Sequence, residues 1–427
     1  MNLFKIIVFV SALGMVNLPT ASPTTAAEEV ANFFKEKVIT IYVGFERASG
    51  HDLYSRVLAR HFGRHIPGKP TVRTENSPGD DSMMLANLVH NRLPQDGTVI
   101  ASIGAGTATT PLLGNKQARF NGSRFNWLGS MNNEVGVCAF WHTIPIKFWQ
   151  DLIDRGATVG GTGAGSDGHV SALVLNNILG TKLALVTGYP NDSYVNHAIE
   201  RGELDGRCGW ALSSLNSSSE KWLKEKKIKI LVQLSMKRHS ALQNVPSIMD
   251  FAKSRLDVQV LKLIYARGLW GRPYLVGPEV PRARVVALRD AFKKTLTDER
   301  FLADAKAHKL DLAWSDGARV QRAIAELYGL PKVAVAAALK ALSNRLNIEM
   351  SRAVIPIETA SGEITALHGG DRRISWAGDG NNGKIGVSRD RTKIFIAGEK
   401  ATHGDLKLGM ICKFSYRAST ARKIYCQ

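Results

Sequence analysis

The chain has 427 residues, 44% hydrophobic and 22% charged, which is enough for a globular protein of two or three domains. Its 56 Lys and Arg residues outnumber 37 Asp and Glu residues, and the formal net charge is +19. The basic residues are spread along the chain, which argues against a nucleic-acid-binding protein and favours small anionic partners. The densest basic run, at 221–229, is interpreted as a solvated helix end that leads into a strand.

The N-terminus has the pattern of a secretory signal peptide at 1–27. Lys5 precedes an apolar run at 6–16, and small residues then lead to Glu28. The apolar run is too short to span a bilayer, and no Cys lies near the cleavage region, which argues against a lipid anchor. No later segment is apolar enough to cross a membrane. We therefore expect cleavage near Ala27 and a soluble protein in the periplasm.

Strand and helix patterns alternate from 38 to about 342, which predicts an α/β fold with mostly parallel sheets. The expected strands lie at 38–43, 71–75, 98–103, 127–131, 135–141, 157–160, 184–187, 206–209, 228–234 and 260–266. The expected helices lie at 53–64, 83–91, 148–154, 170–179, 194–200, 281–296, 299–308 and 318–327.

The tail after about 356 has a different pattern, which predicts a separate small all-β module. Its expected strands lie at 364–367, 372–376, 385–388, 393–397, 410–416 and 423–425. Two dipeptides, Asn382-Gly383 and Ala397-Gly398, have the composition of hairpin turns.

Two glycine-rich turns each follow a predicted strand and precede a predicted helix, at 44–52 and at 160–169. A turn of this kind directs backbone N–H groups and a helix N-terminus toward one point, which suits an anionic group. Two such turns indicate two lobes that close on a small acidic ligand. In the first turn, Asp52 is expected to cap the helix that follows.

The second turn also fits two enzyme patterns. Its glycines at 163, 165 and 168, with Asp192 further on, satisfy a dinucleotide-binding pattern, although that fingerprint usually opens the first βαβ unit rather than lying in mid-chain. The same stretch is a near miss to a nucleophile elbow centred on Ser166. A hydrolase would need a later acid and a later His, and neither His239 nor His308 stands in a recognisable context.

Metal binding is the weaker interpretation of two further patterns. His51-Asp52 and Asp167-x-His169 lack the helical i, i+4 spacing or a CxxC partner, so polar residues at helix N-termini explain them better. The segment from Asp379 resembles a calcium loop, but its glycine comes one place early and Asp390 stands where Glu is usual. A hairpin turn explains that segment better.

The four cysteines fit an oxidising compartment. Cys412 and Cys426 are close in sequence within the β-rich tail, so a local disulfide is expected. Cys138 and Cys208 lie in two predicted strands, and they either pair across neighbouring strands or remain two buried thiols.

From 38 to 342 the chain resembles the solute receptors of the tripartite tricarboxylate transporter system, the Bug family. The matching segments lie at 42–45 with Gly50 and Asp52, and at 75–79, 94–98, 161–166, 186–190, 200–206 and 238–246. Their order and spacing together carry the resemblance. It implies a bilobal periplasmic-binding-protein (Venus flytrap) fold with two Rossmann-like lobes, a ligand held between them, and delivery of organic carboxylates to a membrane permease.

Carried onto this chain, the resemblance implies a first lobe at 36–103 and 235–345, a second at 104–234, and two crossings between them. The β module at 356–427 has no counterpart in the receptor family. The residues expected at the ligand are Gly44, Phe45, Gly50, Asp52, Gly106, Thr107, Thr162, Gly163, Gly165, Ser166 and Tyr189.

The first loop departs from the family pattern. Glu46 and Arg47 enter a loop that is usually richer in glycine, and Asp80 and Asp81 follow Gly79 where small residues are common. A ligand carboxylate beside Glu46 or Asp80 would be repelled unless Arg47 or water lay between them.

The sequence therefore predicts a monomeric, non-enzymatic periplasmic receptor. Its expected partners are a small organic anion, most simply a carboxylate, and a cognate membrane permease; no nucleic acid, cofactor or metal is expected. Two alternatives stay open: a secreted α/β hydrolase that uses Ser166, and a signalling receptor or scaffold whose C-terminal module docks a partner.

Overall fold

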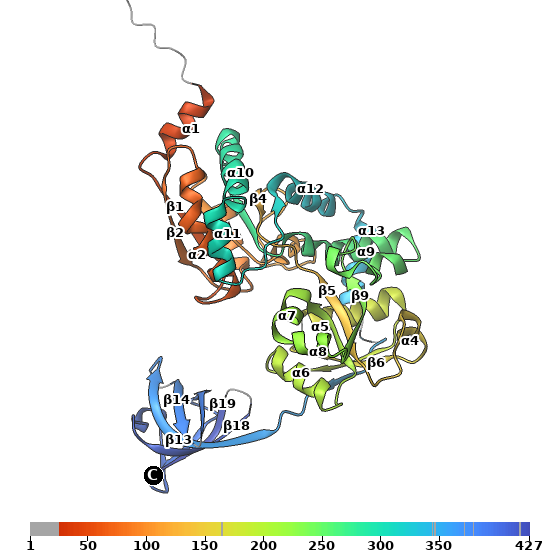
Figure 1. Cartoon of the computed structure of the whole chain (residues 1–427), viewed down its shortest axis with the longest axis vertical. Helices are drawn as coiled ribbons and strands as arrows, with labels where there is room; N and C mark the ends of the chain where they lie inside the picture. The colour runs from red at the N-terminus through yellow and green to blue at the C-terminus, as the bar shows by residue number, and fades with distance from the viewer. Residues whose placement is uncertain are drawn as a thin grey trace, which may run out of the picture.

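The computed structural model describes residues 25–427 apart from 164, 344, 346, 371, 379 and 418–419, and the side chains of 217–218. Most of the expected signal peptide lies outside these residues. Two α/β lobes lie one above the other in Figure 1, and a β module hangs from the lower lobe on an extended segment. Within the described part, no helix is both long and apolar enough to cross a membrane.

Lobe 1 is built on a mixed sheet with the strand order β11-β4-β10-β3-β1-β2. Its parallel strands are β1 (Val38–Val43), β2 (Thr71–Asn76) and β3 (Val99–Ser102). Its antiparallel strands are β4 (Asn126–Ser130), β10 (Pro273–Val276) and β11 (Ser315–Asp316). The helices of this lobe are α1 (Ala26–Phe34), α2 (Gly50–Phe62), α3 (Met83–Asn91), α10 (Arg282–Leu296), α11 (Glu299–Ala307) and α12 (Gly317–Tyr328). The expected cleavage site near Ala27 lies in the first turn of α1.

Lobe 2 is built on a second mixed sheet with the order β12-β7-β6-β8-β5-β9. Its strands are β5 (Gly136–Trp141), β6 (Ala157–Gly161), β7 (Leu183–Thr187), β8 (Gly206–Ala211), β9 (Ile228–Leu234) and β12 (Met350–Arg352). Its helices are α4 (Trp149–Asp154), α5 (Asp167–Val174), α6 (Asp192–Glu200), α7 (Leu212–Ser218) and α8 (Glu220–Lys224), and a π-helical turn at Leu175–Leu179 extends α5.

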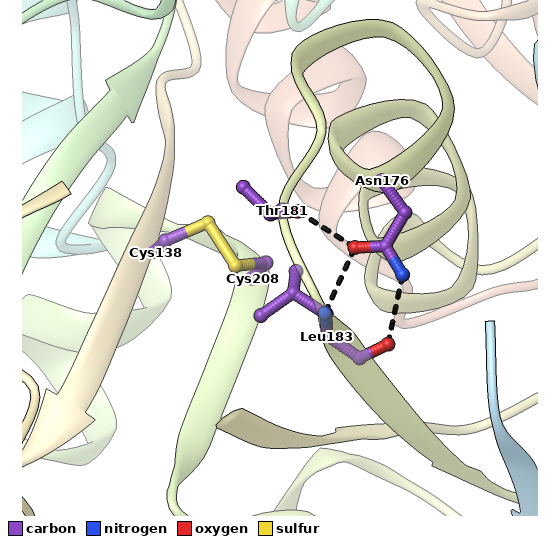
Figure 2. Close-up of a disulfide and its surroundings, with 5 residues drawn as sticks. All are labelled: Cys138, Asn176, Thr181, Leu183 and Cys208. Atoms are coloured by element: carbon purple, nitrogen blue, oxygen red, sulfur yellow. Dashed lines mark hydrogen bonds between the residues drawn. A yellow bond between two sulfur atoms is a disulfide. The ribbon is translucent and has the colours of Figure 1, made fainter. Parts of the chain in front are cut away.

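Two sets of bonds stabilise the core of lobe 2: a disulfide between β5 and β8, and hydrogen bonds at the start of β7. Cys138 of β5 and Cys208 of β8 form a disulfide, with their Cα atoms 3.9 Å apart. Nearby, the Asn176 amide donates to the Leu183 carbonyl at 2.8 Å and accepts from the Leu183 N–H at 2.9 Å (Figure 2). These bonds join the π-helical turn to the start of β7, so the two layers of the lobe meet in a fixed register.

One expected element has the wrong type. The segment 260–266 is not a strand: it belongs to α9 (Arg255–Tyr265), which Ser254 and Asp257 begin with a capping box. Four apolar residues of α9 are buried in a helical pattern, namely Val260, Leu261, Leu263 and Ile264. The β-branched residues resemble a strand locally, but the cap and the periodicity favour a helix. Helix α9 packs on α13 (Lys332–Ser343), an element the sequence did not predict.

The chain changes lobes at other places than expected. Strand β4 lies after residue 103 but pairs with β10 in lobe 1, so the first crossing falls between Ser130 and Gly136. Strand β12 lies after residue 345 but pairs with β7 in lobe 2, so the chain crosses a third time after α13. Both differences involve short strands whose partners are more than a hundred residues away.

The C-terminal module is a seven-stranded sheet with the order β15-β14-β13-β18-β19-β16-β17. Its strands are β13 (Ile357–His368), β14 (Arg373–Gly378), β15 (Asn381–Gly386), β16 (Lys393–Ile396), β17 (Glu399–Ala401), β18 (Ile411–Arg417) and β19 (Thr420–Cys426). Cys412 and Cys426 are opposite each other on β18 and β19 and form the expected disulfide, with a Cα separation of 4.0 Å.

One of the two expected hairpin turns of the module is confirmed. Ala397 and Gly398 both have positive φ, 51° and 86°, as a two-residue turn between β16 and β17 requires. Asn382 and Gly383 are instead inside β15, opposite Ala377 and Trp376. A glycine is needed there because a Cβ on Gly383 would lie 2.8 Å from the Trp376 indole nitrogen.

Candidate ligand-binding cleft

A cavity of about 650 Å³ lies between the two lobes. Lobe 1 contributes Phe45, His51, Asp81 and the segment 104–106, and the connection from α9 to β10 contributes Arg267 and Arg272. Lobe 2 contributes 165–167, Ser171, Gly209 and Ala211, and the crossing segments add Glu134, Gly136 and Leu234. The cavity therefore lies where motion of one lobe against the other would open or close it.

Arg272 lines this cleft and has no carboxylate partner among the described residues. Its backbone is fixed next to β10, where its N–H donates to Ser130 Oγ at 3.0 Å. Nη1 donates to the Gly271 carbonyl at 3.1 Å, and the guanidinium lies 5.5 Å from the centre of the Tyr54 ring. Nε is buried without a hydrogen-bond partner, and no carboxylate of the described residues forms an ion pair with Arg272. A partly buried guanidinium without a carboxylate partner favours an anionic ligand.

His51 lies against Arg272 as a neutral side chain. Burial, and then the neighbouring charge of Arg272, lower its pKa from 6.5 to about 3. Arg272 Nη1 lies 3.4 Å from His51 Nε2, so Nε2 accepts and Nδ1 carries the proton toward Ser102 Oγ at 3.3 Å. The imidazole stacks on the Phe45 ring with centroids 4.1 Å apart. Because His51 is neutral, it neither compensates the positive charge of Arg272 nor repels it.

A second charged group bridges the lobes. Arg267 forms an ion pair with Asp167, the first residue of α5 in lobe 2. Asp81 borders the same cavity on lobe 1; loss of solvation raises the pKa of its carboxyl group, and the charge of Arg267 opposes that rise. Residues 80–82 all have positive φ, and Thr107 Oγ1 donates to the Asp81 carbonyl at 2.8 Å. The loop that carries Asp81 is therefore held in a defined, left-handed conformation.

The N-terminus of α5 opens on the cleft from lobe 2. Ser166 is the N-cap of this helix, and its Oγ accepts from the His169 N–H at 3.4 Å. Gly165 has a φ of 85°, which glycine adopts without strain. The free amides of the first turn carry partial positive charge, and the Asp167 carboxylate lies in the same turn, paired with Arg267.

Four of the residues expected at the ligand border the cavity: Phe45, Gly106, Gly165 and Ser166. Gly44 and Thr107 are buried behind it. A Cβ on Gly44 would lie 2.2 Å from Ser82 Cβ, and Thr107 Oγ1 is 2.9 Å from Ser82 Oγ. Gly50 lies next to the site, because a Cβ there would come within 3.3 Å of Arg272 Nη2.

The other expected residues lie outside the cavity. Thr162 borders a smaller cavity with Asp192 and Arg207, and Gly163 does not line the cleft. Tyr189 is buried in an apolar cluster with Val195 and Ile355. These three residues were expected at the ligand from the sequence, but none of them borders the cleft.

Asp52 has a different role from the one expected. Ser49, not Asp52, caps α2, with its Oγ accepting from the Asp52 N–H at 3.2 Å. The buried Asp52 carboxylate accepts from the Ala48 N–H at 2.9 Å, from Arg56 Nε at 3.0 Å and from Asn76 Nδ2 at 2.9 Å. It therefore ties the loop after β1 to α2 and β2, and its side chain points away from that of His51.

Sequence reasoning did not place four polar or charged residues at the cleft. These are the neutral His51 and the charged residues Asp81, Arg267 and Arg272. A signal was present at 267–272, where two arginines flank the glycines at 268 and 271 and the buried Trp270. That segment was expected to follow a strand, so its charges were not connected with the glycine turns.

Similar folds occur among solved structures. A ligand-free TctC solute-binding protein from Polaromonas aligns with a TM-score of 0.56 at 16% identity, over 70% of this chain and 98% of that one. MatC from Rhodopseudomonas palustris with bound malate gives a TM-score of 0.46 at 16% identity, over 72% and 99%. Another R. palustris protein, with adipate, gives 0.47 at 18% identity, over 70% and 97%. No protein-family model matches the chain, and no curated protein matches it in sequence.

The fold is that of a two-lobed solute-binding protein. More narrowly, about 70% of the chain has the fold of the TctC/Bug solute-binding proteins. The C-terminal β module is an addition to that fold.

Proposed function

We propose that this protein is a periplasmic receptor that captures a small organic carboxylate between its two lobes and delivers it to a membrane permease. The observation that carries the proposal is Arg272, whose Nε is buried without a partner at the wall of a cavity of about 650 Å³ between the lobes. That cavity volume is in the range of small-molecule sites.

The proposed binding mode uses one group from each lobe. The Arg272 guanidinium takes a carboxylate through its free N–H groups, with neutral His51 keeping the cation in place. The amides at the start of α5 and the Ser166 hydroxyl approach from the opposite lobe. A ligand that touches both lobes stabilises the closed arrangement, and closure is the signal a permease would recognise.

Delivery in the periplasm is supported by two features outside the cleft. The N-terminal sequence has the pattern of a secretory signal. All four cysteines are paired in two disulfides, as suits an oxidising compartment.

Calorimetric titration tests the proposal directly. Wild-type protein is stripped of ligand by unfolding and refolding, then titrated with mono-, di- and tricarboxylates. At least one should bind, and Arg272→Gln should weaken that binding by about tenfold to a hundredfold, as expected for lost charge-assisted hydrogen bonds. The control is Arg282→Gln, at the exposed start of α10. Failure of every carboxylate to bind, or equal losses in the two variants, would reject the proposal.

A further inference from the structure

The two ends of the cleft differ in charge. At one end, Arg272 has a neutral histidine as its polar neighbour and no carboxylate partner among the described residues. Glu134 also borders the cavity, but its carboxylate accepts from the Ser213 N–H at 3.3 Å and from Ser213 Oγ at 2.5 Å. The Glu134 carboxylate is therefore engaged by Ser213, and the Arg272 guanidinium has no carboxylate partner among the described residues.

At the other end, two carboxylates share one cation. Arg267 forms its ion pair with Asp167, and the Asp81 carboxylate has no hydrogen-bonded or ion-paired partner among the described residues. The charges of Arg267 and Asp167 both act on Asp81, whereas Arg272 is not among the charges that shift its pKa. With Asp81, Asp167 and Arg267 all ionised, this end has one negative charge in excess.

A wall of rings separates the two ends. A Cβ on Gly104 would lie 3.4 Å from the Asp81 carbonyl and 3.3 Å from the tip of the Phe45 ring. Phe45 in turn stacks on His51, and His51 contacts Arg272. These contacts run from the Asp81 backbone carbonyl past Gly104, Phe45 and His51 to Arg272, and Asp81 and Arg272 both border the cavity.

The difference in charged groups between the two ends of the cleft discriminates between dicarboxylates and ligands that carry one carboxylate and one ammonium group. A dicarboxylate with one end on Arg272 would place its second negative charge near Asp81 and Asp167, where like charges repel. A ligand with a carboxylate at one end and an ammonium group at the other would be attracted at both ends. An α-amino acid with an apolar side chain does not have this charge separation, because its ammonium and carboxylate groups are attached to the same carbon.

We propose that the ligand is an amino-carboxylate whose cationic group is separated from its carboxylate by several bonds, with Arg272 binding the carboxylate and Asp81 the cation. This inference rests on the proposed function and narrows it from organic anions to molecules that carry both charges. It assigns a ligand-binding role to Asp81, at the point where the loop after Gly79 departs from the pattern of the Bug receptors.

The test uses matched pairs of equal chain length, in which an ammonium group replaces one carboxylate. The pairs are β-alanine with succinate, 4-aminobutyrate with glutarate, and 5-aminopentanoate with adipate. Titration of stripped wild-type protein should show that the amino member of the best pair binds at least about tenfold more tightly than its dicarboxylate. Asp81→Asn should reduce that ratio to near one, because its amide keeps the left-handed backbone but loses the charge.

The matched control is Asp80→Asn, an adjacent acid that also has positive φ but does not border the cleft. It should leave the ratio unchanged. A wild type that prefers dicarboxylates, or an Asp81→Asn variant that keeps the wild-type ratio, would overturn this inference alone, provided that Arg272→Gln still weakens carboxylate binding. If no member of any pair binds, the proposed function fails together with it.

Discussion

At the scale of single residues, the proposed cleft depends on a partly buried cation whose hydrogen-bonding and ring partners are neutral groups. Arg272 contacts an aromatic ring, a backbone carbonyl and an imidazole nitrogen. Each partner stabilises a guanidinium without neutralising it, so the charge remains available to a ligand. A carboxylate in the place of His51 would have satisfied Arg272 within the protein and closed the site to anions.

The buried His51 predicts a pH dependence of stability. The unfolded chain binds a proton at this residue near pH 6.5, whereas the folded protein does so only near pH 3. The stability contribution is therefore fully present above pH 6.5 and is lost as the pH falls toward 3. Chemical denaturation across this range should show a wild-type slope that exceeds that of His51→Gln by up to about 1.4 kcal/mol per pH unit.

Its control is His197→Gln, because that side chain is 64% exposed and pairs only with Glu200. The control should keep the wild-type slope. If the free energy of unfolding changed with pH at the same slope in His51→Gln and in wild type, His51 would not be held neutral by the fold.

The network around Asp52 predicts a stability effect larger than that of a helix cap. Asp52→Ala removes a carboxylate that accepts from Ala48, Arg56 and Asn76, and leaves these donors without it. Thermal or urea unfolding should show a loss of about 1–3 kcal/mol. Asp290→Ala is the comparison, since that carboxylate is 69% exposed on α10 and should change stability little. Equal effects would mean that the network contributes nothing.

Residue roles were predicted less well than residue positions. Of the residues predicted at the ligand, Phe45, Gly106, Gly165 and Ser166 border the cavity, and three of them come from the glycine turns, where backbone geometry at a strand end is set locally. Arg267 and Arg272 come from a segment more than a hundred residues after the second turn, and only the return of β10 to lobe 1 brings them there. No local pattern in the sequence reports that approach.

At the scale of elements, the loop from β6 to α5 is a part of lobe 2 that borders the cleft and that the proposed binding mode brings to the ligand. Gly165 borders the cleft, whereas Gly163, two residues earlier, does not, and a Cβ at either position meets no atom within 4 Å. A side chain at 165 would occupy ligand space and would also be strained by the φ of 85°.

We therefore expect Gly165→Leu to weaken ligand binding at least tenfold, with Gly163→Leu as its matched control. Calorimetry on both variants, with circular dichroism to show that they are folded, measures the difference. The sequence-based expectation that Gly163 itself contacts the ligand predicts the opposite order of the two effects. A larger loss at 163 than at 165 would restore that expectation.

Element types followed from local sequence wherever capping and periodicity agreed. The alternation of strands and helices predicted the α/β lobes, and the glycine after Ala397 predicted a hairpin turn. The exceptions include α9, whose β-branched residues imitate a strand, the unpredicted helix α13, and short strands such as β10 and β12. A strand of three or four residues carries little pattern of its own and is defined by its partner in the sheet.

At the scale of the whole molecule, the end of the receptor and the start of the module are distinct. Segment 347–353 belongs to lobe 2: β12 pairs with β7, and the Ala353 N–H donates to the Thr187 carbonyl at 2.9 Å. Ile355 is also buried against Tyr189 and its neighbours. The module begins only with β13, and its own buried cluster includes both cysteines of the second disulfide.

Two truncations test this boundary. A chain that ends at residue 356 should keep the thermal stability of the lobes and bind ligand as the full chain does. A chain that ends at residue 345 loses an edge strand and should melt at a lower temperature. Differential scanning calorimetry of both, with ligand titration, makes the comparison. Identical melting of the two truncated chains would place 347–353 outside the lobe.

The central claim is that the cleft holds a small carboxylate through Arg272, and native mass spectrometry tests it most directly. Wild type, Arg272→Gln and Arg282→Gln are purified alike and sprayed under native and denaturing conditions. The account predicts one small-molecule adduct per chain in wild type and in Arg282→Gln, released on denaturation and identified as a carboxylate, and a strongly reduced adduct in Arg272→Gln. A released adduct without a carboxyl group, or one retained equally by Arg272→Gln, would contradict it.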